Sequence, residues 1–257
     1  MLFRSTIVLA SNYFYSNLLK AQLALGFLLL FNRCANIENQ YVISGNTMGT
    51  TYLVKIITSD NDYEMGSIEK SIDSLLIQLN KQMSTWDPES EISQFNDWNS
   101  KVPFAVSDDF LNVVKKSITI SEDTGGLFDP TVFDLMSLWG FGPNPRSGFP
   151  DIEDVHRVLE HTGIGQIEII DSVLVKINKK CKLDLNAIAK GYGVDKIFNF
   201  LNQKGFNNIF VEIGGEVKCS GKNIKNKNWS IGIEDPSADG NRSEEHTSEL
   251  QSPCNLV

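Results

Sequence analysis

The feature that most constrains the fold is a single apolar stripe along residues 67–83. Its members recur at the three- and four-residue spacing of one helical face, which predicts an amphipathic helix. They are Ile68, Ile72, Leu75, Leu76, Leu79 and Met83. The chain has 257 residues, 41% of them hydrophobic, which is enough apolar material for one domain with a core of its own.

The remaining helices and strands come in runs rather than in strict alternation. Caps and glycine stops predict two further helices, over 107–125 and 150–162. In the second of these, Ile152, Val155 and Leu159 are expected to face inward. A third is expected over 189–204, with Tyr192, Ile197, Phe200 and Leu201 facing inward. Strands are expected at 41–58 (in two runs around a turn at Ser44-Gly45-Asn46), 166–170, 173–177, 181–185, 208–213 and 229–233. This order favours an α+β fold, with mixed or antiparallel sheets and flanking helices in a single domain.

The charge pattern excludes one class of partner. The formal net charge is −9, and no segment gathers Lys and Arg residues. Binding a nucleic-acid backbone requires several cations on one face, so no nucleic-acid partner is expected. A polyanionic small ligand could still bind locally, through backbone N–H groups, one or two lysines and a metal ion.

Residues 1–34 have the pattern of an export signal or a membrane anchor. Arg4 and Lys20 precede the apolar run 23–31, which is shorter than the about 20 residues of a membrane span. Cys34 follows directly, where a bacterial lipoprotein carries its lipid, although Asn32-Arg33 is not the small-residue motif of lipoprotein cleavage. We expect export to the periplasmic face of the inner membrane. Lipidation of Cys34 and an uncleaved anchor helix are both left open.

Residues 240–257 differ in character from the rest of the chain. The run 242–253 has the periodicity of neither a strand nor a helix, and it resembles the translated read-through of a sequencing adaptor. A disordered polar tail is the alternative. We favour the first interpretation, in which the domain occupies residues 35–239 and its C-terminal part is missing.

Two familiar nucleotide-binding signatures fail in this sequence. Gly163 and Gly165 are followed by Glu168 where a dinucleotide fingerprint requires Gly. The stretch from Gly215 to Gly221-Lys222 is one residue too long for a P-loop, and Asn223 replaces its Ser or Thr. Neither a Rossmann nor a P-loop enzyme is supported.

Six short polar, turn-prone segments instead lie at the ends of the expected elements. They are GNTMGT (45–50), MSTWDP (83–88), FDPT (128–131), LWGFG (138–142), DLNAIAKG (184–191) and EIGG (212–215). Each is weak by itself, because glycine-rich turns usually serve backbone geometry. In this order and spacing they closely resemble the ApbE family, over residues 41–235.

The resemblance implies an activity and its reactants. Members of the family use Mg²⁺ and FAD, and they transfer FMN to a Thr hydroxyl of an acceptor protein, with release of AMP. The acceptor would be a subunit of a membrane redox complex. Phosphoryl transfer depends more on positive charge beside the pyrophosphate than on covalent help from the protein. A metal ion and one Lys provide that charge.

The resemblance also assigns roles to particular residues. Met48 and Trp86 would line the flavin nucleotide, Leu127, Phe128, Asp129 and Asp184 would hold the adenosine, Lys190 would face the phosphates, and the Ala187 carbonyl would bind Mg²⁺. These residue types suit the roles, since an aromatic ring can stack on a flat ring and a carboxylate accepts from an amine or hydroxyl. Each also has a plainer interpretation: cap or turn residues for the carboxylates, core for Trp86 and a solvated helix residue for Lys190.

One departure from the family limits the assignment. The family's Asp and Thr ligands for Mg²⁺, which also prepare the acceptor hydroxyl, have no match here, so the catalytic residues stay unassigned and this chain is expected to be inactive. Two other functions stay open: an FAD pyrophosphatase, and a non-catalytic exported FAD-binding lipoprotein. We expect Met48, Asp129, Asp184 and Lys190 to line one cleft together with Gly214-Gly215, and Trp139 and Phe141 to form its walls.

Overall fold

The computed structural model describes residues 38–60, 63–144 and 146–232. The chain divides into two compact units, Met1–Glu38 and Asn39–Val257, and the fold described below is that of the second. The apolar run 23–31, Cys34 and the segment 240–257 lie outside the described residues, so the expectations about them stay predictions. Among the described residues, no helix is both long and apolar enough to cross a membrane.

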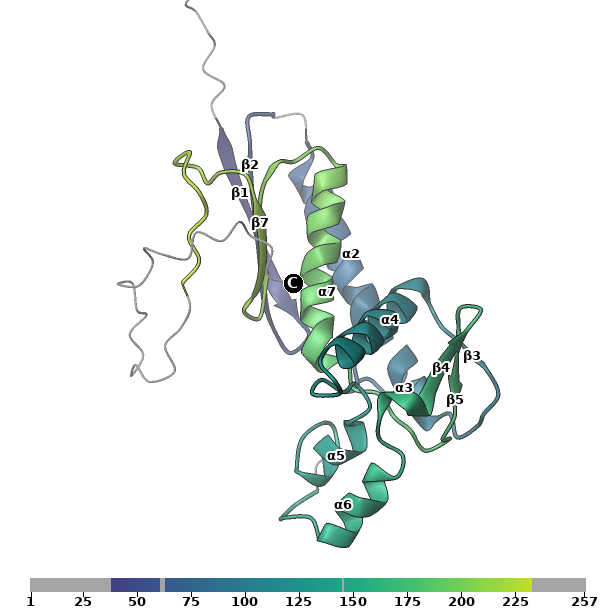
Figure 1. The fold of residues 1–257 in the computed structure, drawn as a ribbon. Helices are drawn as coiled ribbons and strands as arrows, with labels where there is room; N and C mark the ends of the chain where they lie inside the picture. The colour runs from purple at the N-terminus through teal and green to yellow at the C-terminus, as the bar shows by residue number, and fades with distance from the viewer. Residues whose placement is uncertain (1–37, 61–62, 145, 233–257) are drawn as a thin grey trace, which may run out of the picture. The chain divides into compact units, whose positions relative to one another are not determined.

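A four-stranded antiparallel sheet forms one layer of the domain (Figure 1). Its strands are β1 (Asn39–Thr47), β2 (Thr50–Thr58), β6 (Asn208–Ile213) and β7 (Glu216–Ser220), in the order β1-β2-β6-β7. Each neighbouring pair is antiparallel, and β2 pairs with β6 from the far end of the described chain. The sheet therefore brings the β1–β2 turn close to segments that follow much later in the sequence.

The β1–β2 turn lies at Met48-Gly49, and the predicted turn at Ser44-Gly45-Asn46 is wrong. Met48 and Gly49 have φ values of 49° and 71°, and a two-residue turn with two positive φ angles matches the twist of a hairpin. Gly45 lies within β1, opposite Tyr52. A Cβ at this position would come within 2.7 Å of the Tyr52 ring. Gly45 thus makes room for a cross-strand ring rather than for a turn.

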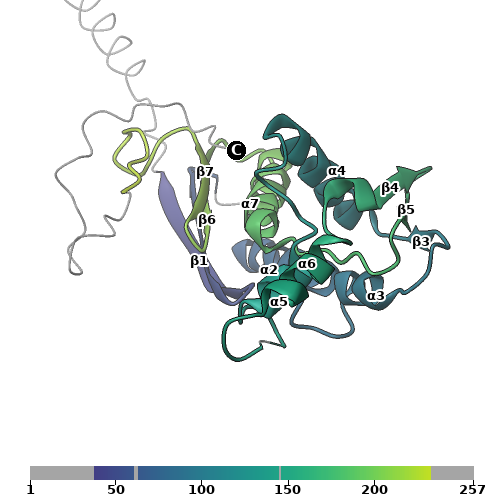
Figure 2. The ribbon, with the colours of Figure 1, turned by 60° about the horizontal axis from the view of Figure 1, so that its bottom comes forward.

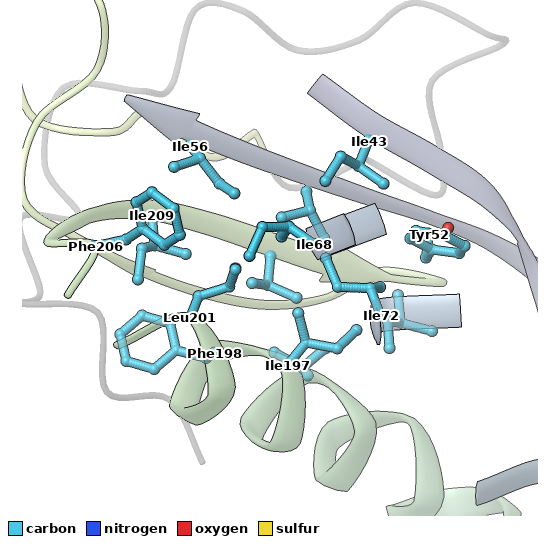
Figure 3. Close-up of a cluster of buried hydrophobic side chains, with 14 of the residues drawn as sticks. Ile43, Tyr52, Ile56, Ile68, Ile72, Ile197, Phe198, Leu201, Phe206 and Ile209 are labelled. Atoms are coloured by element: carbon cyan, nitrogen blue, oxygen red, sulfur yellow. The ribbon is translucent and has the colours of Figure 1, made fainter. Parts of the chain in front are cut away.

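Helices α2 (Met65–Met83) and α7 (Asn186–Gln203) pack against one face of this sheet (Figures 1 and 2). The predicted stripe of α2 is confirmed, because all its members except the half-buried Leu75 are buried. Figure 3 shows Ile68 and Ile72 of α2 in the same cluster as Ile197 and Leu201 of α7. Strand residues complete this core: Ile43, Tyr52, Val54, Ile56, Ile209, Val211 and Ile213.

A second core lies beyond the C-terminal end of α2. It is enclosed by α3 (Glu91–Asp97), α4 (Asp108–Asp123) and a three-stranded antiparallel sheet of β3 (Phe104–Ala105), β5 (Val173–Lys176) and β4 (Ile167–Ile170). Phe95, Phe110 and Leu174 are fully buried in it. In the described residues the domain has six α-helices and two antiparallel sheets, which confirms the α+β prediction.

The strand predicted at 181–185 does not form. The segment alternates buried and half-buried residues, but a side chain takes the place of a neighbouring strand. Asn96 Oδ1 accepts from Leu183 N at 2.7 Å, and Asn96 Nδ2 donates to Leu183 O at 2.8 Å. An alternating apolar pattern alone does not tell whether a buried backbone will be hydrogen-bonded by a neighbouring strand or by a side chain.

Two further predictions were wrong for reasons of packing. Helix α6 (Ile152–Leu159) packs mainly on α5 (Phe133–Leu138) and has no buried residue, so Ile152 and Leu159 are 59% and 49% exposed rather than inward. The short 3₁₀ helix Ile164–Gln166 follows. The described part of the predicted strand at 229–233 is irregular. Trp229 lies against Phe210 with the two rings tilted, and it donates from Nε1 to Ser220 O at 2.8 Å.

Candidate functional site

A cavity of about 460 Å³ opens between the β1–β2 turn, the C-terminal end of α2 and the start of α7. Its lining residues are Met48, Gly49, Leu79, Asn80, Met83, Ser84, Trp86, Asn186, Ala189 and Lys190. Three of the residues predicted to bind the flavin nucleotide therefore meet here: Met48, Trp86 and Lys190. The lining combines apolar side chains with two amides and one cation, which suits a flat organic ring joined to an anionic group.

Trp86 reaches this cavity on a loop that its own hydrogen bonds hold in shape. Ser90 Oγ donates to Ser84 O at 2.7 Å and caps α3 by accepting from Ser93 N at 3.2 Å. Asp87 Oδ1 accepts from Glu89 N at 2.9 Å. The Trp86 side chain is nevertheless 66% exposed. An uncovered ring on a loop with a defined backbone offers a stacking face to a planar ligand.

Lys190 is the one cation of the lining. Its side chain is half-buried and makes no ion pair with the other described residues. Gly214, at the β6–β7 turn, lies against its stem, since a Cβ there would be 3.2 Å from Lys190 Cδ. An unpaired ammonium group close to the start of a helix favours an anion at this end of the cavity.

Helix α7 is anchored on both sides of Lys190. At its start, Asn186 N donates to Asp184 Oδ1 at 2.8 Å. Further along, Tyr192 and Lys196 both donate to Asp109 on α4, Tyr192 at 2.7 Å. Burial, together with the Asp109 bond, raises the pKa of Tyr192 to about 12. Lys190 therefore projects from a helix that is fixed relative to the cavity.

Asp129 and Asp184 lie on neighbouring segments beside the cavity, not in its lining. Asp184 N donates to Pro130 O at 2.7 Å, which joins the two segments. Asp129 Oδ1 accepts from the Thr131 backbone N at 2.8 Å and from its Oγ1 at 2.6 Å. In each carboxylate one oxygen is thus used in a local turn, and in the described residues the other is left for a further donor.

The remaining predicted residues lie at the surface or near it. Leu127 is 93% exposed, and Phe128 is half-buried, with its N–H donating to Thr124 Oγ1 at 3.2 Å. Ala187 is exposed in the first turn of α7. Trp139 and Phe141 were expected as walls of the cleft, but they do not line the cavity and are themselves exposed.

Sequence analysis missed two polar lining residues, Asn80 and Asn186. Each lay within reach of a segment already singled out: Asn80 is just before MSTWDP, and Asn186 is inside DLNAIAKG. The signal for Asn80 was its position directly after Leu79, at the C-terminal end of the apolar stripe. A polar residue there reaches the ligand side of a helix whose other face is core.

Metal ligands are sparse in this region. In residues 38–60, 63–144 and 146–232, no group of three or more His, Cys, Asp or Glu side chains is placed to hold a metal ion. A site for a hard cation requires several oxygen ligands. Backbone carbonyls, such as that of Ala187, are outside this finding, and the Mg²⁺ role of Ala187 stays a prediction.

Comparison with known proteins identifies the family. The sequence model of the ApbE family matches residues 48–254, most of this chain. The chain belongs to the ApbE family. It is 42% identical over 217 residues to the FAD:protein FMN transferase of Vibrio cholerae, and 36% identical over 238 residues to that of Haemophilus influenzae. These alignments cover 84% and 89% of this chain, and 65% and 68% of the relatives.

Solved structures of the family share the fold. The flavin transferase ApbE from Vibrio cholerae superimposes with a TM-score of 0.75 at 41% identity, over 77% of this chain and 65% of that chain. The apo flavinyl transferase ApbE from Pseudomonas stutzeri gives a TM-score of 0.73 at 32% identity, over 76% of this chain and 66% of that chain. The chain thus spans about 65% of the length of the Vibrio cholerae protein.

Proposed function

We propose that the protein is a flavin transferase that moves FMN from FAD onto a Thr hydroxyl of an acceptor protein and releases AMP. The observation that carries the proposal is the cavity in which the exposed Trp86 ring, Met48 and the unpaired Lys190 meet. In the reaction, a bond forms between the Thr oxygen and the FMN phosphorus. The pyrophosphate bond to AMP breaks, AMP leaves with the bonding electron pair, and the hydroxyl proton is lost.

FAD fits the residues present. Gly49 at the rim has no heavy atom within 4 Å of the position where a Cβ would lie, so the backbone can be approached closely there. We assign the FMN half to the cavity, against Trp86 and Met48, with Lys190 toward the phosphates. The adenosine half would extend to Asp129 and Asp184, whose unused oxygens can accept from ribose or adenine, and to Leu127 and Phe128.

Mg²⁺ belongs to the proposal for the whole protein. Among the described residues, the exposed Ala187 carbonyl is the ligand that the family resemblance assigns to it, and no step is derived through the ion. Bound there, Mg²⁺ would supply positive charge to the pyrophosphate. Lys190, held by the anchored helix α7, would add a second positive charge on the same side.

The acceptor and its location are also part of the proposal. The names of the relatives specify a protein as the FMN acceptor, which agrees with a protein partner here. We propose that the acceptor is a subunit of a membrane redox complex, and that the enzyme meets it at the periplasmic face of the membrane. The basic and apolar pattern of residues 1–34 supports export. The exported protein would be attached to the membrane by a lipid on Cys34 or by an uncleaved anchor helix. Labelling with radioactive palmitate, compared between the native chain and Cys34→Ala, tests the lipid.

Because the 257 residues alone are expected to be inactive, the decisive experiment uses a chain that also carries the C-terminal part of the family. It is incubated with FAD, Mg²⁺ and a Thr-bearing acceptor protein, and all products are followed. Transfer predicts covalent flavin on the acceptor, in amounts equal to the AMP released, and none on an acceptor with Thr→Val. Free FMN and AMP without labelled acceptor would identify a pyrophosphatase instead. Recovery of intact, bound FAD would identify a non-catalytic carrier.

A further inference from the structure

The side chain of Asn80 is oriented by its nitrogen. Asn80 lies in the last turn of α2, and its Nδ2 donates to Thr47 Oγ1 at 2.9 Å and to Leu76 O at 2.9 Å. A backbone carbonyl only accepts hydrogen bonds, so the group facing Leu76 O has to be the amide nitrogen. The buried Thr47, the last residue of β1, thereby ties the Met48-Gly49 turn to α2.

This orientation leaves the carbonyl oxygen of Asn80 for the cavity. Both amide hydrogens are used, Asn80 is half-buried, and it lines the cavity. In the described residues Oδ1 has no hydrogen-bond partner. The side chains next to it in the lining include the apolar Leu79 and Met83. An acceptor at the cavity surface that has no partner among the described residues is free to accept from a ligand that brings a donor.

We propose that Asn80 is a binding residue for the flavin half of the substrate, and this rests on the function proposed above. Its Oδ1 accepts from a donor of FMN, the imide N–H or a ribityl hydroxyl, while the bonds of its Nδ2 to Leu76 O and Thr47 Oγ1 keep the amide in this orientation. Phosphate oxygens are acceptors at neutral pH and are served by Lys190. The two side chains therefore recognise opposite ends of the FMN half, one its donors and the other its charge.

A pair of variants separates the oxygen from the anchoring nitrogen. Asn80→Ala removes both functions. Thr47→Val removes one partner of Nδ2 but leaves Leu76 O to orient the amide, so Oδ1 still faces the cavity. The dissociation constants of FMN, FAD and AMP for the 257-residue chain are measured by calorimetry for each protein. Far-UV circular dichroism and thermal unfolding check the fold, and Asn80→Ser serves as a second variant should Asn80→Ala fail to fold.

A neutral hydrogen bond predicts that Asn80→Ala weakens FMN and FAD by about three- to tenfold, and Thr47→Val by no more than about twofold. AMP binding should not change. Equal losses in the two variants, or an Asn80→Ala protein that binds FMN as tightly as the native chain, would overturn the role of Oδ1 while leaving the flavin site intact. A native chain that binds neither FMN nor FAD would overturn the proposed function, and the role of Asn80 with it.

Discussion

Lys176 gives the sharpest test of how burial shapes this protein. It lies on β5 with only 1% of its surface exposed, and its Nζ donates to Asn96 O at 3.1 Å. Nζ also lies 4.7 Å from the centroid of the Phe95 ring. No carboxylate pairs with it among the described residues. Burial, with a smaller contribution from the nearby Lys182 charge, lowers the pKa of Lys176 from 10.5 to about 8.

The sign of the pH effect follows from this shift. Because the pKa is lower in the folded state, the unfolded chain binds more protons between about pH 8 and 10.5, and stability rises with pH in that window. Below about pH 8 both states carry the proton and the penalty is fully present. At 1.36 kcal/mol for each pKa unit, the complete effect is about 3 kcal/mol, and about 2 kcal/mol of it is gained by pH 9.5.

The perturbation is Lys176→Met, which keeps the apolar stem and removes the titrating group. We expect the free energy of unfolding of the native chain to rise, relative to that of the variant, by about 2 kcal/mol between pH 7 and 9.5. Urea unfolding followed by circular dichroism at several pH values measures it. The comparison with the variant is essential, because burial raises the pKa of the Cys181 thiol to about 12, which lowers stability above about pH 9 in both proteins. Parallel pH profiles for the two proteins would refute the reasoning.

Three other substitutions test separate parts of the structure. Trp86→Ala should weaken FAD binding but change the free energy of unfolding by less than about 0.5 kcal/mol, because the residue is 66% exposed. Flavin fluorescence measures the binding and thermal unfolding measures the stability. A large loss of stability would make Trp86 a core residue. Asp109→Asn should cost about 2 kcal/mol near pH 7, measured by urea unfolding. Burial alone would raise the pKa of Asp109, but the hydrogen bonds from its two donors on α7 lower it. The stabilisation that Asp109 gives should therefore disappear as the pH falls through its folded-state pKa. A difference in the free energy of unfolding between the native chain and Asp109→Asn that does not change with pH would contradict this. Gly214→Ala should lower the melting temperature more than Gly215→Ala does. Both residues have a positive φ, but only at Gly214 would the added Cβ meet other atoms, since it would lie 2.7 Å from Thr50 Cγ2. Equal losses of melting temperature would mean that backbone strain alone matters.

The sequence predicted best those elements whose pattern has one physical cause. Helix α2 forms as expected because an apolar stripe of this length has no other way to be buried. Helix α6 shows the limit of the same argument, since its stripe has the right spacing but the structure provides little beyond α5 to cover it. Whether an apolar helix face becomes part of the core depends on which elements pack against it. The spacing of apolar residues along the helix does not contain that information.

The same limit applies to the candidate site. Met48, Trp86 and Lys190 could be predicted to lie together because they belong to segments with a specific order, and the structure brings all three to one cavity. The orientation of the Asn80 amide could not be, because it depends on a hydrogen bond to Thr47, which is distant in the sequence. Asp129 illustrates the opposite case, in which a local turn with Thr131 uses one oxygen of a carboxylate that the sequence marks for a ligand.

The central claim is that Lys190 serves the phosphates of FAD in the cavity at the start of α7. The most direct test is the dissociation constant of FAD for Lys190→Ala, compared with that for Lys179→Ala, an exposed lysine that is not part of the cavity lining. Loss of a charge-assisted hydrogen bond predicts at least about tenfold weaker binding for Lys190→Ala, with an unchanged melting temperature. Lys179→Ala should bind FAD like the native chain. Equal affinities for the two variants would contradict the account.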